Sequence, residues 1–240
     1  MINFDTVDHS ILLSRLSTSF GINGKALAWF RCYLHNRSQF ISIDSYRSTN
    51  RPLTCGVPQG SVLGPILNLM YVSPVGCIMR HHGVSYHTYA DDSQVYITFK
   101  LDDLEDLEIA SGTLEQCIVD VNNWMQQNNV KLNQDKSELI VMHAKHRLRP
   151  SLESIEVGES TIVPSDSARN IGVIFDSTFS LDSHIIELCK TAFYHLRTLS
   201  KIRRYLSYDT TKVLINAFVI SHLDNCNSLM YGLPKYLIDR

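Results

Sequence analysis

The sequence predicts an α+β fold in which antiparallel strands are packed by helices. Three observations support this class. Residues 84–89 have the β-branched and aromatic content of a strand, and residues 93–99 alternate polar and apolar side chains, so the two segments form a hairpin around Asp91-Asp92. Apolar residues recur at helical spacing on both sides of this hairpin, and the composition turns strand-like again from Ser151.

The composition describes a globular protein. Of the 240 residues, 44% are hydrophobic and 19% charged, which excludes a disordered chain. The longest apolar stretches are too short to span a bilayer, and the first residues lack the basic region of a secretory signal. The six cysteines are scattered, which is typical of reduced thiols in a nuclear or cytoplasmic protein. The net charge of −2 gives no overall attraction for nucleic acid, so any surface that binds nucleic acid must be a local basic region.

Two amphipathic helices are expected near the start of the chain. The first lies between a capping Asp8 and a terminating Gly21, and its apolar residues are Ile11, Leu12, Leu16 and Phe20. The second has a single apolar stripe, formed by Leu27, Phe30 and Leu34. A short strand over residues 39–43 is expected to follow.

A glycine-rich loop, GVPQGSVLGP over residues 56–65, opens the next helix. Glycines allow the backbone to approach a ligand closely, and Pro58 stiffens the first part of the loop. Ser61 is a candidate cap for a helix that runs through Val62, Leu67 and Met70. From the residues alone, a plain turn into a helix is the preferred interpretation.

Downstream of the hairpin, an acidic run at residues 102–108 is typical of a helix N-terminus, and a long apolar stripe follows. A turn at residues 132–138 then leads into a strand at 139–142. A second hairpin is expected around Gly158-Glu159, followed by one strand over residues 169–175.

The last part of the chain is predicted to be helical. Asp182 or Ser183 caps a helix whose apolar side consists of Ile185, Cys189, Phe193, Leu196 and Leu199, and Ser207 caps the final helix. Five cations without an intervening acid form a local basic surface: Lys190, Arg197, Lys201, Arg203 and Arg204. Such a surface suits nucleic-acid phosphates, although a solvated helix face is the alternative.

The loop GVPQGSVLGP followed by YADD at residues 89–92 resembles the palm of a reverse transcriptase, and FDTVDH at residues 4–9 resembles part of its first motif. The residues of these motifs most resemble those of non-LTR (LINE-type, CR1-like) retrotransposons. The resemblance implies a palm with a central antiparallel sheet over residues 1–178, without fingers, and a helical thumb over 179–240 that is cut at its C-terminus.

The resemblance also implies roles for single residues. Asp91 and Asp92 are the catalytic ligands of Mg²⁺ or Mn²⁺, Phe4 is the steric gate against a ribose 2′-hydroxyl, and Gln59 and Gly60 contact substrate. Lys136 lies near the leaving pyrophosphate, and the five cations face an RNA template and a DNA primer extended with deoxynucleotides. The alternatives left open by the residues are turn chemistry alone for Asp91-Asp92, a core position for Phe4 and a solvated turn lysine for Lys136.

The motifs also bear on whether this chain has polymerase activity. In this family another metal-binding Asp precedes the aromatic gate by five positions, and counting back from Phe4 passes Met1. The sequence therefore predicts a reverse-transcriptase-like domain that is inactive as this chain and binds the metal weakly; a non-catalytic module that binds nucleic acid or protein is the alternative. We also expect both Asp residues exposed at the hairpin tip, with the Phe4 segment beside them in one sheet.

Overall fold

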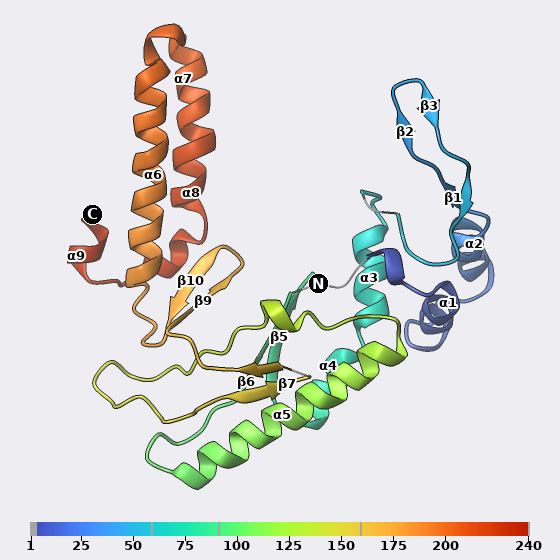
Figure 1. The fold of residues 1–240 in the computed structure, drawn as a ribbon, viewed down its shortest axis with the longest axis horizontal. Coiled ribbons are helices and arrows are strands. Elements are labelled where there is room, and N and C mark those ends of the chain that lie inside the picture. Colours follow the sequence, from blue (N-terminus) through green and yellow to red (C-terminus); the bar gives the residue numbers. More distant parts are fainter. Residues whose placement is uncertain (1–3, 59, 91, 159, 240) are drawn as a thin grey trace. The chain divides into compact units, whose positions relative to one another are not determined.

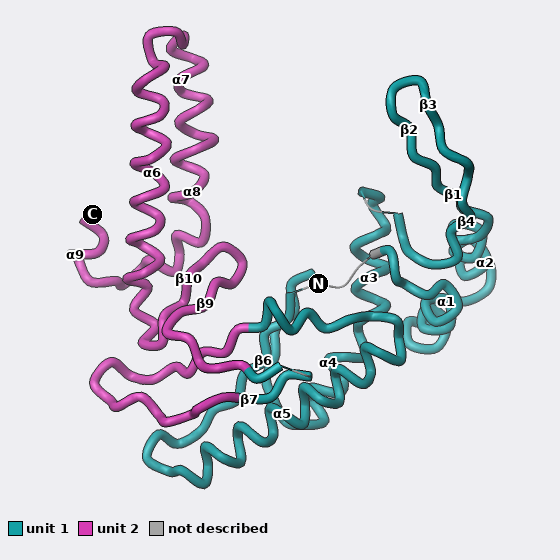
Figure 2. Tube along the Cα trace, in the orientation of Figure 1, with its two compact units in different colours: residues 1–137, 155–161 teal, residues 138–154, 162–240 magenta. Residues whose placement is uncertain are grey.

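The computed structural model describes residues 4–58, 60–90, 92–158 and 160–239, and it combines helices with short antiparallel strands (Figure 1). Two compact units are distinguished by their internal contacts (Figure 2). The first unit consists of residues 1–137 and 155–161, and the second of residues 138–154 and 162–240. The boundary at residue 178 between a palm-like and a thumb-like part stays a prediction.

Helices are the longest elements of both units. Those of the first unit are α1 (His9–Thr18), α2 (Gly24–Leu34), α3 (Gly64–Val72), α4 (Val75–His81) and α5 (Leu104–Gln127). Those of the second unit are α6 (Asp182–Ile202), α7 (Tyr208–Ile215), α8 (Ser221–Asp224) and α9 (Lys235–Ile238). Within the described ranges, no helix is both long and apolar enough to cross a membrane.

The strands pair in twos. They are β1 (Ser38–Gln39), β2 (Ser42–Ile43), β3 (Tyr46–Arg47), β4 (Arg51–Pro52), β5 (Ser85–Tyr89), β6 (Asp92–Tyr96), β7 (Ile155–Val157), β8 (Ser160–Ile162), β9 (Ser167–Asn170) and β10 (Val173–Asp176). In the part of the chain that is described, the pairs are β1–β4, β2–β3, β5–β6, β7–β8 and β9–β10. The α+β class is therefore correct, but the expectation of one central sheet is wrong.

The Phe4 segment is one reason for this difference. Phe4–Thr6 is a 3-10 turn, so its predicted place in a sheet with the hairpin is wrong. The next residues bond to a different partner: Val7 O accepts from Gly56 N–H at 2.8 Å, and Asp8 forms an isolated bridge with Cys55. The end of the segment thus pairs with residues 55 and 56, at the start of the glycine-rich loop, and not with the hairpin.

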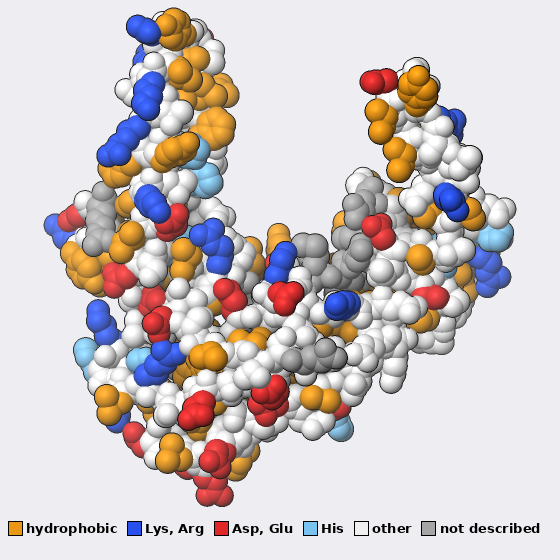
Figure 3. Space-filling model, in the orientation of Figure 1, with side chains coloured by type: hydrophobic (Ala, Val, Ile, Leu, Met, Phe, Trp, Pro, Cys, Tyr) orange, Lys and Arg blue, Asp and Glu red, His pale blue; other side chains and the backbone are white. Residues whose placement is uncertain are grey.

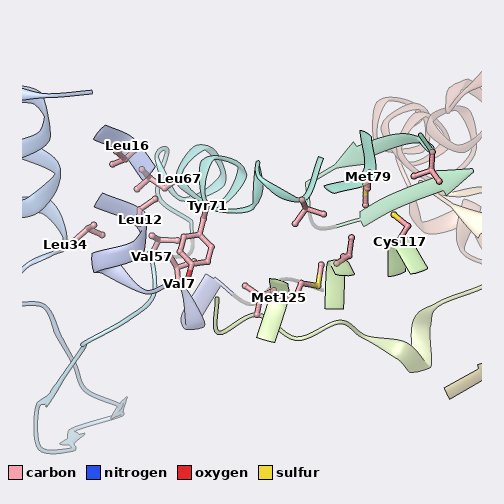
Figure 4. Close-up of a cluster of buried hydrophobic side chains, with 14 residues drawn as sticks. Val7, Leu12, Leu16, Leu34, Val57, Leu67, Tyr71, Met79, Cys117 and Met125 are labelled. Atoms are coloured by element: carbon pink, nitrogen blue, oxygen red, sulfur yellow. The ribbon is translucent and has the colours of Figure 1, made fainter. Parts of the chain in front are cut away.

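The core of the first unit is formed mainly by α1, α3, α4 and α5, with α1 packed on α3 and α4 packed on α5. Leu12, Leu16 and Tyr71 are fully buried, and Figure 4 shows Leu12, Leu67 and Tyr71 close together between α1 and α3. Asp8 caps α1 as predicted, since its Oδ1 accepts from the N–H groups of Ser10 and Ile11. This cap fixes the start of α1 directly beside the glycine-rich loop.

Asn68 of α3 is an unusual member of this core. Its side chain is 2% exposed, and its Oδ1 has no hydrogen-bond partner in the described structure. A buried polar atom without a partner costs free energy, so an apolar side chain would suit this position better.

Two expected strands of the second unit differ from the structure. Residues 139–142 form no strand, and Ile140 makes only one isolated bridge, to Ser165. The single strand over 169–175 is instead the hairpin β9–β10, whose turn contains Ile171 (φ 46°) and Gly172 (φ 84°). Two consecutive residues with positive φ are typical of a tight two-residue hairpin turn, which reverses the chain.

Helix α6 also corrects the sequence interpretation. It begins at Asp182 after Leu181, so neither Asp182 nor Ser183 is its N-cap. On its apolar side Ile185 and Leu199 are buried, but Phe193 (54% exposed) and Leu196 (40%) face solvent. The Ser207 cap of α7 is confirmed, because its Oγ accepts from Thr210 N–H at 3.1 Å.

His184, in the first turn of α6, makes the stability of the second unit sensitive to pH. The side chain is buried, and its Nδ1 lies 3.5 Å from the N–H of Ile174. Burial and then the charge of Arg169 lower the pKa of His184 below its usual 6.5. Because the unfolded chain then binds the proton more readily, stability is complete above pH 6.5 and falls as the pH drops toward the folded-state pKa.

We therefore expect the melting temperature of the chain to fall between about pH 7 and pH 5, with His184→Gln showing a flatter profile. The matched control is His146→Gln, at an exposed position of the same unit, which should keep the parent slope. Thermal unfolding followed by circular dichroism across this range measures both. Equal slopes for parent and His184→Gln would contradict the assignment.

Candidate functional site

The hairpin β5–β6 places the predicted acidic pair. Its strands pair antiparallel from Ser85↔Tyr96 to Tyr89↔Asp92, so only residues 90 and 91 connect them. Ala90 has a φ of 54°, as tight two-residue connections require. Asp92 is exposed at the first position of β6, and Asp91 lies outside the described residues. The predicted hairpin is thus confirmed.

Helix α4 supports this hairpin. Val95 and Ile97 pack against the core, and Tyr86 of β5 lies against Gly76 of α4. A Cβ at Gly76 would lie 2.5 Å from the hydroxyl oxygen of Tyr86, so glycine permits this close approach of helix and strand. The Arg80 guanidinium also donates a hydrogen bond to the Tyr86 hydroxyl. The carboxylate of Asp92 is therefore presented by a hairpin with a fixed base.

The glycine-rich loop is held at its first end by the segment that precedes α1. Gly56 N–H donates to Val7 O, and His9 Nε2 lies 2.7 Å from Gly56 O. Gly56 has a φ of +89°, which favours glycine, and a Cβ there would be in tight contact, 3.0 Å from Asp5 O. The fold thus brings together FDTVDH and GVPQG, which are far apart in sequence.

The second end of the loop is held by Ser61. Its Oγ donates to Pro58 O at 2.7 Å and accepts from Gly64 N–H at 3.0 Å. Ser61 therefore bonds to the start of α3, although the residue next to the helix is Leu63 and the helix begins at Gly64. Between the two anchored ends lie Gln59, outside the described residues, and Gly60, which is exposed with a φ of +76° and open space around it.

The other predicted substrate residues lie on separate turns. Lys136 is exposed at the end of the 3-10 turn Gln134–Lys136. Gln134 of that turn accepts a hydrogen bond from Ser160 Oγ at 3.1 Å. Phe4 begins the 3-10 turn Phe4–Thr6, whose backbone lies beside Gly56 through Asp5.

The described residues do not complete a metal centre. In these ranges no group of three or more His, Cys, Asp or Glu side chains can hold an ion. A carboxylate such as Asp92 is the hard oxygen ligand that Mg²⁺ and Mn²⁺ prefer, but one described carboxylate is too few. The donor set therefore does not fit a resident divalent ion by itself.

The predicted basic surface follows one face of α6. Lys190, Tyr194, Arg197 and Lys201 are three or four residues apart and all exposed, and Figure 3 shows basic side chains along this helix. Arg203 and Arg204 follow in the 3-10 turn Arg203–Tyr205, with the Arg204 guanidinium 4.7 Å from the Tyr205 ring centre. A shallow hollow of about 500 Å³ on α6 is lined by Glu187, Lys190, Thr191, Phe193, Tyr194 and Arg197. Exposed aromatic rings thus lie beside the cations.

One hydrogen-bond network in the first unit was not predicted from the sequence. Arg15 of α1 donates to Tyr71 O and to Asn128 Oδ1, and the Tyr71 hydroxyl donates to Asn128 O at 2.7 Å. The Arg15 guanidinium also lies 4.6 Å from the Tyr71 ring centre and 4.8 Å from that of Trp124. Burial lowers the pKa of Arg15 from its usual value. The network ties α1 to α3 and to the end of α5.

Comparison with known proteins agrees with these features. The family described as "Reverse transcriptase (RNA-dependent DNA polymerase)" matches residues 3–175. The chain is 26% identical to the Drosophila melanogaster "RNA-directed DNA polymerase from mobile element jockey", over 77% of this chain and 20% of that protein. It is also 26% identical to the D. melanogaster "Probable RNA-directed DNA polymerase from transposon X-element", over 66% of this chain and 17% of that protein. The chain thus spans about a fifth of the length of these curated relatives.

Proposed function

The chain belongs to the reverse transcriptase (RNA-dependent DNA polymerase) family, in its non-LTR retrotransposon branch, and from this premise we propose that it forms the template- and nucleotide-binding part of such an enzyme. The observation that carries the proposal is the pair of presented elements in the first unit. A loop anchored at both ends exposes Gly60, and a supported hairpin exposes Asp92.

The proposed roles of single residues follow from the match to the family's motifs. Gln59 and Gly60 contact the incoming deoxynucleotide, and Phe4 excludes a ribose 2′-hydroxyl. Lys136 lies near the leaving pyrophosphate. Asp91 and Asp92 supply carboxylates toward Mg²⁺ or Mn²⁺, and further ligands are required before catalysis. The protein acts in the nucleus or cytoplasm, where its template RNA is found.

The second proposed role is binding of an RNA template paired with a DNA primer by α6 in the thumb-like part. Its cations are exposed along one face, and exposed Tyr194 and Phe193 add stacking surfaces beside them. Contacts with phosphates release counterions, so this binding weakens as salt rises and is independent of sequence.

Replacing Arg197, Lys201, Arg203 and Arg204 by Ala together is expected to weaken binding of an RNA–DNA hybrid and to flatten its salt dependence. Each lost phosphate contact lowers the slope of log affinity against log salt by about 0.7–0.9, so the slope should fall by about 3. Fluorescence anisotropy with a labelled hybrid, titrated at several salt concentrations, measures both quantities.

A matched control carries the same change in charge on the first unit: Lys25, Arg31, Arg47 and Arg51, all exposed, replaced by Ala. If both quadruple variants lose affinity equally, the effect reflects net charge and the α6 assignment fails. Unchanged affinity in the α6 variant would show that its basic face is solvated and does not contact nucleic acid.

A non-catalytic binding module is the second candidate function. It is favoured by the incomplete metal centre, because the described residues offer too few carboxylates to hold the ions of a polymerase. This candidate keeps the nucleic-acid binding of α6 but assigns no chemistry to the hairpin. Primer extension separates the two.

A further inference from the structure

The backbone N–H and the backbone carbonyl of Gly56 both bond to one short segment, residues 7–9. Its N–H donates to Val7 O at 2.8 Å, and its carbonyl oxygen lies 2.7 Å from His9 Nε2. A carbonyl oxygen only accepts hydrogen bonds, so Nε2 of His9 must carry the hydrogen. The contact therefore fixes both the ring orientation of His9 and the direction of the Gly56 carbonyl.

His9 projects from a rigid element. It is the first residue of α1, directly after the Asp8 cap, whose Oδ1 accepts from Ser10 N–H at 2.8 Å and Ile11 N–H at 3.0 Å. One turn further on, Leu12 is fully buried in the core. The imidazole is thus carried by a capped and buried helix, and it reaches across to a loop without regular secondary structure.

The first half of the loop is held in place by the buried side chain of Val57 and by the bridge between Asp8 and Cys55, and the His9 bond adds a fixed direction for the Gly56 carbonyl. Ser61 anchors the second half through Pro58 O and Gly64 N–H. At the first half, the backbone bond to Val7 sets where the chain passes, and the His9 bond sets which way the Gly56–Val57 peptide faces. The orientation of that peptide determines where the following residues, up to exposed Gly60, are presented.

We infer that His9 is a positioning residue, which orients the glycine-rich loop for deoxynucleotide binding through its hydrogen bond to the Gly56 carbonyl. This inference rests on the proposed function for its ligand, but the positioning itself is a property of the chain. His9 needs no contact with the substrate in this role. What matters is a donor at the location of Nε2.

Two substitutions separate the donor from the bulk of the side chain. His9→Leu removes the donor, whereas His9→Gln retains an N–H donor at a similar reach from the backbone. The matched control is His35→Leu, at an exposed position of the same unit. Amide hydrogen exchange of residues 56–64 in the 240-residue chain, read with its melting temperature, reports on the loop without requiring activity.

For His9→Leu we expect exchange of the described loop amides to speed up by about tenfold, which corresponds to about 1.4 kcal/mol, while amides of α5 keep their protection. His9→Gln should stay within about twofold of the parent. Equal exchange in the Leu and Gln variants, or equal acceleration across the whole unit, would overturn the positioning role.

Deoxynucleotide triphosphate binding, measured by saturation-transfer NMR, supplies the functional arm. We expect affinity to fall about tenfold in His9→Leu and to be restored in His9→Gln. If the parent binds no deoxynucleotide, the proposed function fails while the exchange result still decides the role of His9. If the loop loosens but deoxynucleotide affinity is unchanged, the link between loop orientation and binding is overturned.

Discussion

A polypeptide of residues 1–240 is expected to leave a DNA primer unextended on an RNA template, with deoxynucleotides and either Mg²⁺ or Mn²⁺. Nucleotide transfer of this kind uses two ions about 3.5–4 Å apart, which need carboxylates from more than one segment. No group of three ligands exists among the described residues, and Asp91 and Asp92 are adjacent in the sequence, so their like charges repel. Losing several kcal/mol of transition-state stabilisation, at about 1.4 per tenfold, slows the rate by on the order of 10³-fold.

The control for this experiment is Asp92→Asn, which removes the described carboxylate but keeps the size of the side chain. Parent and variant should show the same background on a denaturing gel that resolves single-nucleotide additions. Extension by the parent that disappears in Asp92→Asn would show that the chain assembles a working centre, and the inactive interpretation would then be wrong.

Replacing Arg15 by Ala is expected to cause a large loss of stability in the first unit. The change removes donors from Tyr71 O and Asn128 Oδ1 and the cation beside the rings of Tyr71 and Trp124. Partly buried acceptors that lose a charged donor cost about 1.5–3 kcal/mol each, so we expect a decrease of about 3 kcal/mol in the free energy of unfolding. For a unit of this size, the melting temperature should fall by about 6–12 °C.

Arg31→Ala is the matched control, because Arg31 is exposed on α2 and belongs to the same unit. Its effect should stay within about 0.5 kcal/mol. Urea titration followed by tryptophan fluorescence measures both variants, since Trp124 lies in the network itself. A loss below about 1 kcal/mol for Arg15→Ala would show that the network does not hold α1, α3 and α5 together.

Features set by neighbouring residues could be predicted from the sequence. The Asp8 cap of α1, the Ser207 cap of α7 and the hairpin around residues 90 and 91 each depend on local side-chain chemistry, and all are confirmed. The apolar stripe of α5, predicted as Leu114, Ile118, Val121, Trp124 and Met125, is confirmed in part, since Val121 and Met125 are buried whereas Leu114 and Ile118 are half-buried.

Features that depend on contacts between residues far apart in the sequence could not be predicted. His9 contacts Gly56, 47 residues away in the sequence, and Arg15 contacts Asn128, 113 residues away. The periodicity of the sequence gives no indication of such pairs. The prediction of a single strand over 169–175 is wrong for a local reason: apolar Ile171 at the turn resembles a strand residue that continues into Val173, Ile174 and Phe175. The exposed Phe193 and Leu196 show that an apolar stripe does not reveal how much of it a neighbouring element covers.

The central claim is that the hairpin and the glycine-rich loop present one substrate site, and Mn²⁺-induced line broadening in an amide NMR spectrum tests it most directly. Mn²⁺ added with a deoxynucleotide triphosphate should broaden amides next to Asp92 and those around Gly60 together, and Asp92→Asn should abolish both effects. Broadening confined to the acidic first turn of α5, at Glu105 and Asp106, with the hairpin and loop unaffected, would contradict the account.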